Sequence, residues 1–204
     1  MKYWFVFAVS VMMAFASPAT AGFKEGIVAF KSNDYKTAKA EWLPLAQGGH
    51  ALAQYNLGIM YRKGLGVRKD QLQALKWYQS AAGNGLAKAQ YSLGVFYEKG
   101  RGGLPKNVTA AVNLYMQAAE GGNSYAQLAL ARHLENGEGA ERDLVEAMTW
   151  YIIAAKSSKG KLRRKTAQAR DKLKDSLSDD EVSMAEEFAR EWLRDIRRSQ
   201  PKKK

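Results

Sequence analysis

A chain of 204 residues with 46% hydrophobic residues is long enough to bury a substantial core and has room for one or two domains. It contains no cysteine, which excludes a disulfide framework, thiolate catalysis and a lipid-modified cysteine. The formal net charge of +12 makes the chain strongly basic. Such a charge favours anionic partners through a long-range attraction that salt screens.

The first 21 residues have the organisation of a secretory signal peptide. Lys2 provides the positive start, residues 5–16 form an apolar run, and Ala19, Thr20 and Ala21 form a small-x-small cleavage site. The run is shorter than the roughly 20 residues that a membrane-spanning helix needs. We therefore expect cleavage after Ala21 and a mature chain that is periplasmic or secreted and not membrane-spanning. An uncleaved anchor is the alternative.

Residues 22–52 predict a degenerate helical unit. A short first helix over residues 23–31 is followed by Asp34, which is placed to cap a second helix, and Gly48 marks the end of that helix. The inward positions of the second helix are Ala38, Trp42, Leu45 and Ala46. Terminal units of a helical array need a more polar outer face, so a weaker match to the units that follow is expected here.

Three near-copies of one sequence follow, over residues 53–88, 89–125 and 126–156. Their starts are 36 and then 37 residues apart, a period that is typical of helical repeat arrays. Within each copy, small and apolar residues recur four positions apart, which places them along one side of a helix. These residues are Ala53, Leu57 and Tyr61, then Ala89, Leu93 and Tyr97, then Ala126, Leu130 and Leu134.

Each copy also predicts a second helix, with Asp70, Asn107 or Asp143 at its N-cap. Its apolar stripe has the pattern of a core face, and an aromatic ligand site is the alternative interpretation. The stripe consists of Ala74, Trp77, Tyr78, Ala81 and Ala82, then Ala111, Leu114, Tyr115, Ala118 and Ala119, then Ala147, Trp150, Tyr151, Ala154 and Ala155. Gly58 and Gly94 lie in first helices, where a glycine costs about 1 kcal/mol relative to alanine. They therefore predict the close approach of a neighbouring helix.

With these residues the chain resembles the Sel1-like repeat family, a branch of the tetratricopeptide-type solenoids. The family pattern, A-x-x-x-L-G-x-x-Y-x-x-G-x-G-x-x-x-D followed by A-x-x-W-Y-x-x-A-A, is met almost in full over residues 53–82. The second copy departs from it at Asn107 and Leu114, and the third at Ala131 and Leu134. The resemblance implies an all-α, right-handed solenoid of antiparallel helix pairs. It also implies a scaffold or adaptor, because exported bacterial members of the family often serve envelope signalling, secretion or host contact.

After residue 156 the repeat stops, and residues 157–198 predict two capping helices that close the array. The first covers residues 160–177, and Ser178 with Glu181 forms a capping box for the second. We expect the inward stripe of the last helix to consist of Met184, Ala185, Phe188, Trp192 and Ile196. Residues 199–204 form a basic tail.

The sequence contains no recognisable catalytic constellation. Its two histidines, His50 and His133, belong to no metal-binding pattern, and neither a phosphate-binding glycine loop after a strand nor a nucleophile elbow is present. Glu135 and Glu138 are expected at an exposed helix end, where nothing would raise the pKa of a general acid. We therefore expect no enzyme, no metal and no cofactor. A hydrolase is the remote alternative, because some cysteine-rich members of the family are associated with β-lactam binding, but this chain has no cysteine.

Two surfaces are candidates for binding a partner. The first is the side of the first helices opposite their inward stripe, which would line the concave face of a superhelix. Apolar residues exposed there would mark a binding surface, although they would also be suited to pack on the neighbouring unit. The nine positions are Tyr55, Ile59, Arg62, Tyr91, Val95, Glu98, Leu128, Arg132 and Glu135.

The second surface is a basic run over residues 156–174, in which nine basic residues face one acid, Asp171, for a local charge of 9 − 1 = +8. The nine are Lys156, Lys159, Lys161, Arg163, Arg164, Lys165, Arg170, Lys172 and Lys174. In an exported protein this run suits anionic glycan, lipopolysaccharide or phospholipid, and the alternative is a solvated helix face. Nucleic acid is disfavoured by the compartment and by the absence of stacking aromatic residues. We predict a non-enzymatic envelope scaffold that binds a protein, with a binder of anionic envelope polymers as the alternative.

Overall fold

The computed structural model describes residues 18–199, in which every regular element is an α-helix. The ten helices are α1 (Pro18–Lys31), α2 (Tyr35–Gln47), α3 (Ala51–Lys63), α4 (Gln71–Gly83), α5 (Ala87–Lys99), α6 (Val108–Glu120), α7 (Ser124–Asn136), α8 (Leu144–Ser157), α9 (Gly160–Lys174) and α10 (Asp179–Ser199). Most of the predicted signal peptide and of the basic tail lies outside the described residues. No helix within residues 18–199 is long and apolar enough to cross a membrane.

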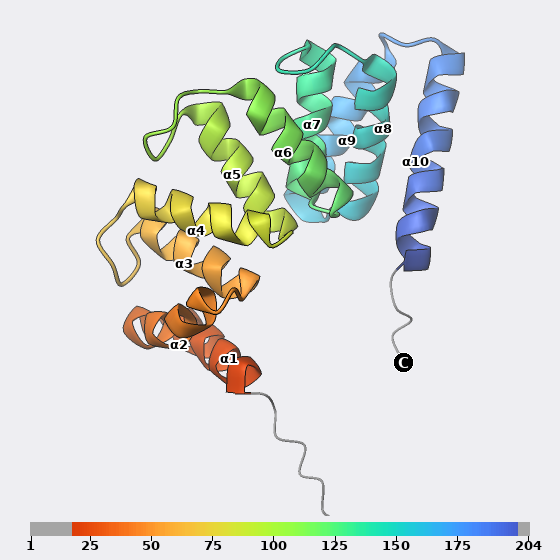
Figure 1. Ribbon diagram of the computed structural model, residues 1–204. Coiled ribbons are helices and arrows are strands. Elements are labelled where there is room, and N and C mark those ends of the chain that lie inside the picture. Colours follow the sequence, from red (N-terminus) through yellow and green to blue (C-terminus); the bar gives the residue numbers. More distant parts are fainter. Residues whose placement is uncertain (1–17, 200–204) are drawn as a thin grey trace, which may run out of the picture.

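The helices pack in consecutive pairs along an arc (Figure 1). α1 packs on α2, α3 on α4, α5 on α6 and α7 on α8, and each second helix also packs on the first helix of the next pair. Buried residues form three clusters, over α1–α3, α4–α5 and α6–α10, rather than one centre. This nearest-neighbour arrangement is that of a solenoid, and the predicted all-α fold is confirmed.

The N-caps of the second helices are the residues that the sequence predicted. Side-chain oxygens of Asp70, Asn107 and Asp143 accept hydrogen bonds from backbone N–H groups at 2.8–2.9 Å and thereby cap α4, α6 and α8. The first helices end at glycines with left-handed backbone, such as Gly64 with φ of 73° and Gly137 with φ of 69°. A residue with a Cβ would be strained at such a position, and glycine is not.

Glycines inside the first helices make room for rings of the second helices. A Cβ added to Gly58 would lie 2.6 Å from the Tyr78 ring, and one added to Gly26 would lie 2.3 Å from the Trp42 ring. The N-terminal unit therefore uses the same contact as the first repeat, although its sequence is degenerate. The side chains of Trp42, Tyr78, Tyr115 and Tyr151 are all 1% exposed, so the prediction of a core stripe is confirmed.

A recurring glutamine, which the sequence analysis did not single out, ties neighbouring pairs together. The buried side chain of Gln54 donates to the carbonyl oxygen of Ala46 at 2.9 Å, and Gln127 donates to that of Ala119 at 3.1 Å. In both cases a side chain of a first helix donates a hydrogen bond to a backbone carbonyl near the end of the preceding second helix, where no partner within that helix is available. The signal was present in the sequence, because an Ala-Gln pair opens every repeat.

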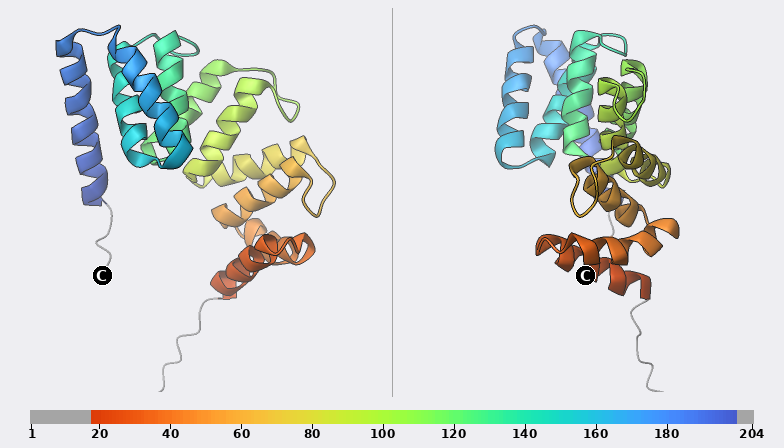
Figure 2. Two further views of the ribbon diagram at one scale, coloured as in Figure 1. Left: turned by 180° about the vertical axis from the view of Figure 1, so that it is seen from behind. Right: turned by 90° about the vertical axis from the view of Figure 1, so that its left-hand side faces the viewer.

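The last two helices both pack on α8, with α9 behind it and α10 beside it in the view of Figure 1; Figure 2 shows the same pair from behind. As a consequence, every residue of α8 from Ala147 to Ala155 is buried. The capping box of α10 is formed as predicted: Glu181 accepts from the backbone N–H of Ser178 at 2.8 Å, and Ser178 Oγ accepts from the backbone N–H of Glu181 at 3.3 Å.

The predicted inward stripe of α10 is partly wrong. Met184 and Phe188 are 48% and 50% exposed, whereas Val182, Ala185 and Ala189 are buried. The prediction placed α9 and α10 together, as a helical pair that closes the array. Instead α10 packs on α8, where Val182, Ala185 and Ala189 are covered and Trp192 packs edge-on against Trp150 with ring centroids 5.7 Å apart. Met184 and Phe188 stay at the margin of this contact.

Candidate partner-binding groove

Three adjoining pockets open along the first helices of successive units. The α3–α5 pocket has a volume of about 490 Å³, the α5–α7 pocket about 270 Å³ and the α7–α9 pocket about 310 Å³. Tyr91 lines all three pockets, so they form one continuous surface, which we call the groove. The groove is therefore built mainly from α3, α5 and α7, the helices that the sequence analysis assigned to the concave face, and α9 extends it at one end.

Seven of the nine predicted partner-binding residues line the groove. They are Tyr55, Arg62, Tyr91, Val95, Glu98, Leu128 and Arg132. Ile59 lines none of the three pockets and, like Tyr55, packs against the cluster over α4 and α5, as the alternative interpretation allowed. Leu128 is only 7% exposed and belongs to the cluster over α6–α10. The carboxylate of Glu135 accepts a 2.6 Å hydrogen bond from the hydroxyl of Tyr151.

The tyrosines of the second helices hold charged residues of the first helices in place. The hydroxyl of Tyr115 donates to Glu98 at 2.5 Å, and that of Tyr78 accepts from Nε of Arg62 at 3.1 Å. Burial raises the pKa of Tyr115 far above its ordinary value, and the hydrogen bond to Glu98 raises it further. The phenol thus stays protonated and remains a donor to the carboxylate. Each ring is part of the core, while its oxygen fixes a charged side chain at the groove.

Tyr91 is the centre of an aromatic cluster on the groove surface. Its ring centroid lies 5.7 Å from that of Tyr115 below it and 6.0 Å from that of Tyr125 beside it. Tyr125 is 58% exposed and was missed by the sequence analysis. It directly precedes the third repeat, at a position where the first two repeats are preceded by Leu52 and Lys88. Because this position varies, the repeat pattern gave no signal for it.

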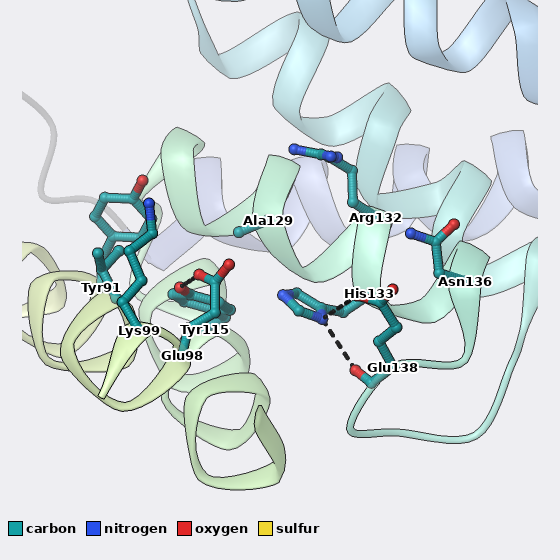
Figure 3. A pocket seen from close by; sticks show the side chains of 10 residues that line it. Tyr91, Glu98, Lys99, Tyr115, Ala129, Arg132, His133, Asn136 and Glu138 are labelled. Carbon is teal, nitrogen blue, oxygen red and sulfur yellow. Dashed lines mark hydrogen bonds and ion pairs between the residues drawn. The ribbon is translucent and has the colours of Figure 1, made fainter. Parts of the chain in front are cut away.

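The α5–α7 pocket contains the most polar part of the groove (Figure 3). Glu98 and Lys99 come from α5 on one side, and His133 comes from α7 on the other. Nδ1 of His133 lies 2.9 Å from the backbone oxygen and 3.8 Å from the carboxylate of Glu138. Within residues 18–199, no group of three or more His, Cys, Asp or Glu side chains is placed to hold a metal ion.

The basic run predicted over residues 156–174 lies at one end of the groove. Eight of its nine basic residues are exposed, and the ninth, Arg170, is half-buried and bonded to Asp171 at 2.6 Å. Lys161 and Lys165 line the α7–α9 pocket together with Arg132. The two binding surfaces that the sequence suggested are therefore adjacent, because α9 takes the place of the next first helix. The exposed eight are Lys156, Lys159, Lys161, Arg163, Arg164, Lys165, Lys172 and Lys174.

The Sel1 repeat model matches residues 51–86, 87–123 and 124–158, which is more than half of the chain. The chain belongs to the Sel1 repeat family. Each matched repeat begins two residues before the predicted boundary, close to the first residue of α3, α5 and α7.

Solved structures of similar proteins share the fold of this Sel1 repeat protein. A Sel1 repeat protein from Oxalobacter formigenes is 36% identical, with a TM-score of 0.64 over 67% of this chain and 56% of the other. A protective antigen of uropathogenic Escherichia coli strains, which has an SLR fold, is 21% identical, with a TM-score of 0.60 over 91% of this chain and 49% of the other. The second likeness concerns the fold alone.

The curated relatives are named as regulators and not as enzymes. An exopolysaccharide production negative regulator of Rhizobium meliloti is 32% identical over 148 residues, which are 66% of this chain and 55% of that protein. A chitin synthase regulator of Malassezia restricta is 35% identical over 127 residues, which are 61% of this chain and 9% of that protein. The chain thus spans about half the length of the first relative and a small part of the second.

Proposed function

We propose that this Sel1 repeat protein is a non-enzymatic adaptor of the bacterial cell envelope and that it binds a protein partner in the groove. The observation that carries the proposal is the continuous groove, in which Tyr91 joins three pockets. The relatives' names support a regulatory adaptor, since they describe regulators of exopolysaccharide production and of chitin synthase. The envelope location rests on the signal peptide predicted from the sequence.

The groove has the physical properties of a protein-binding surface. Tyr55 and Tyr91 are half-buried, so each ring is held by its neighbours while one side stays available. Tyrosine is common among the residues that dominate binding energy at interfaces. Arg62 and Glu98 are already held by Tyr78 and Tyr115, so less conformational entropy is lost when a partner pairs with them.

A photo-crosslinking amino acid at Ser92, which lines the α3–α5 pocket, tests the proposal in the envelope of living cells. The matched control carries the crosslinker at Asn113, which is exposed on α6 and lies outside the groove. We expect a discrete protein adduct at Ser92 and none at Asn113. Tyr91→Ala should weaken binding of the identified partner by about 1–4 kcal/mol while the helical content stays unchanged. Equal adducts at both positions, or none at Ser92, would overturn the proposal.

A second candidate function is binding of an anionic envelope polymer through α9. The exposure of eight basic residues in and around this helix favours it. In that case binding of lipopolysaccharide or of anionic phospholipid vesicles should be strong at low salt and weaken steeply as salt rises. It should depend on Arg163 and Arg164, and Tyr91→Ala should leave it unchanged.

A further inference from the structure

We propose that the groove recognises an acidic protein segment in which an aromatic or large apolar side chain stands between acidic residues. This inference rests on the proposed function and names the chemistry of its partner. It is carried by the arrangement of charge and aromatic rings along the groove. Two cationic pockets share a pair of tyrosines, the half-buried Tyr91 and the exposed Tyr125, and a third pocket beside them contains carboxylates as well as cations.

The α3–α5 pocket forms one cationic end of the groove. Arg62, Lys88 and Arg101 line it, and no acidic residue does. None of the three has an ion-pair partner among residues 18–199. The bond from Arg62 to Tyr78 uses only Nε, so the remaining N–H donors of the guanidinium stay available for a carboxylate. This pocket therefore offers three positive charges without an ion-pair partner, of which that of Arg62 is held in place by Tyr78.

The α7–α9 pocket forms the other cationic end of the groove. Arg132 from α7 and Lys161 and Lys165 from α9 line it, again without an acidic residue. In the part of the chain that the structure describes, these three side chains likewise have no ion-pair partner. Because α9 closes the array, its basic residues extend the positive charge of the groove beyond the last repeat.

The two cationic pockets meet at Tyr91 and Tyr125, which line both of them. The two rings lie 6.0 Å apart and are inclined by 32°, and the Tyr125 ring is 58% exposed. An apolar or aromatic side chain placed on this pair would bury surface that water now covers. A segment that spans both pockets would thus have acidic residues at each end and its anchor in the middle.

The α5–α7 pocket distinguishes a protein segment from a uniformly charged polymer. It opens at the same Tyr91 and contains the carboxylates of Glu98 and Glu138 together with the cations of Lys99 and Arg132. A polymer with a negative charge on every unit would place some of that charge beside these carboxylates, which is less favourable than in the two wholly cationic pockets. A polypeptide can place a neutral or basic side chain there, so the mixed charge of the groove favours a protein ligand.

A fluorescent heptapeptide, Asp-Glu-Asp-Phe-Asp-Glu-Asp with neutral ends, is a suitable probe for the mature chain in fluorescence anisotropy. Two matched peptides replace Phe by Ala, or the acidic residues by Asn and Gln. Poly-L-glutamate and alginate serve as polymers of uniform charge. We expect the Phe peptide to bind at least about fivefold more tightly than the Ala peptide, and the amide peptide not to bind. Binding should weaken as salt rises.

Variants of the protein assign the binding to the groove. Tyr91→Ala and Tyr125→Ala should each weaken binding of the Phe peptide by about fivefold or more and bring it to the level of the Ala peptide. The double charge reversal of Lys161 and Lys165 to Glu should weaken binding by about tenfold or more. The reversal of Arg163 and Lys174 to Glu is the matched control: both residues are exposed, line none of the three pockets and lie on the opposite side of α9 by helical spacing, so it changes the net charge equally and should have little effect.

The outcomes separate this inference from the function on which it rests. Dependence on Phe, on the tyrosines and on the two lysines within the groove supports it. Equal effects of the two double charge reversals, or tighter binding of poly-L-glutamate or alginate than of the Phe peptide, would overturn it in favour of a polyanion. If the acidic peptides fail to bind while a protein is still crosslinked at Ser92, this inference is wrong and the adaptor function stands. The absence of any crosslinked protein would overturn the adaptor function itself.

Discussion

Gly94 and the ring of Tyr115 are in direct contact between α5 and α6, and a Cβ added to Gly94 would lie 2.6 Å from Cε1 of the ring. The contact lets the phenol oxygen pass beneath α5 and reach Glu98 at the groove. Core packing and the position of a charged residue at the groove are thus determined by the same pair. The third repeat carries Ala131 at this position, so the spacing there accommodates a methyl group.

Gly94→Ala should destabilise the protein by about 1–3 kcal/mol, because the added methyl group overlaps the Tyr115 ring and the ring is confined by the core. Gly83→Ala is the matched control, since Gly83 also lies in a helix and a Cβ there would meet nothing within 4 Å. The control should be neutral or more stable by up to about 1 kcal/mol. Urea unfolding measures both, and equal stability of the two variants would contradict the contact.

Tyr115→Phe should lower the free energy of unfolding by about 1–3 kcal/mol. It removes only the hydroxyl, which donates to an ionised carboxylate, and a hydrogen bond to a charged group contributes in this range. Tyr125→Phe removes a hydroxyl from an exposed ring and should change stability by less than about 0.5 kcal/mol. If both variants unfold at the same urea concentration, the bond to Glu98 contributes nothing to stability.

Alkaline pH should destabilise the protein through its buried tyrosines. Burial raises the pKa of Tyr78, Tyr115 and Tyr151 above the ordinary value of 10.0, and hydrogen bonds to carboxylates add to the shift in the last two. The unfolded chain therefore loses these protons first. The stability that these groups provide is complete below about pH 10 and falls above it by about 1.4 kcal/mol per pH unit for each tyrosine.

Urea unfolding at about pH 9 and about pH 11, combined with the ultraviolet absorbance of tyrosinate, tests this dependence. The three tyrosines should ionise only as the protein unfolds. Tyr115→Phe removes one of the groups, so its stability should decrease less steeply with pH than that of the wild type. An identical slope for the two proteins would show that Tyr115 does not contribute to the alkaline loss.

The fold was predictable because each repeat signals the same structure several times. The caps at Asp70, Asn107 and Asp143 and the inward residues of both helices recur in register, so an error in one copy is corrected by the others. The end of the chain has no such redundancy. The side of α10 that faces α8 depends on contacts between helices that no repeated pattern in the sequence reveals. The exposure of Met184 and Phe188 follows from that contact.

The groove was only partly predictable, because some of its residues occupy positions that do not recur in the repeats. Tyr55, Arg62 and Tyr91 occupy repeated positions whose direction follows from helical geometry. Tyr125 occupies a variable position, and its place beside Tyr91 depends on how α7 packs against α5 and α6. The meeting of Arg132 with the basic residues of α9 likewise depends on the path of the chain after α8. Contacts between repeats were thus harder to foresee than contacts within them.

Export should be accompanied by cleavage after Ala21, so that the mature chain begins at Gly22. The basis is the charged start, the apolar run and the Ala-Thr-Ala site of the sequence. Intact-mass spectrometry of the protein from the periplasmic and culture fractions measures it. Thr20→Ala keeps the small-x-small pattern and should be processed normally, whereas Ala21→Asp should block cleavage. An uncleaved wild-type chain in the membrane fraction would indicate an anchor instead.

Leu93→Ala should destabilise the array by about 2–5 kcal/mol, the range for truncating a buried leucine. Leu93 is 7% exposed in the cluster over α4 and α5, in the middle of the three repeats. In a solenoid each unit is stabilised by its neighbours, so loss at the centre should also uncouple the units on either side. Differential scanning calorimetry should show a transition at lower temperature and over a broader range for this variant.

Leu72→Ala is the matched control. It truncates a leucine that is 50% exposed on α4 and should leave the transition almost unchanged. A sharp, single transition for Leu93→Ala at the wild-type temperature would mean that the middle repeat does not couple the two ends.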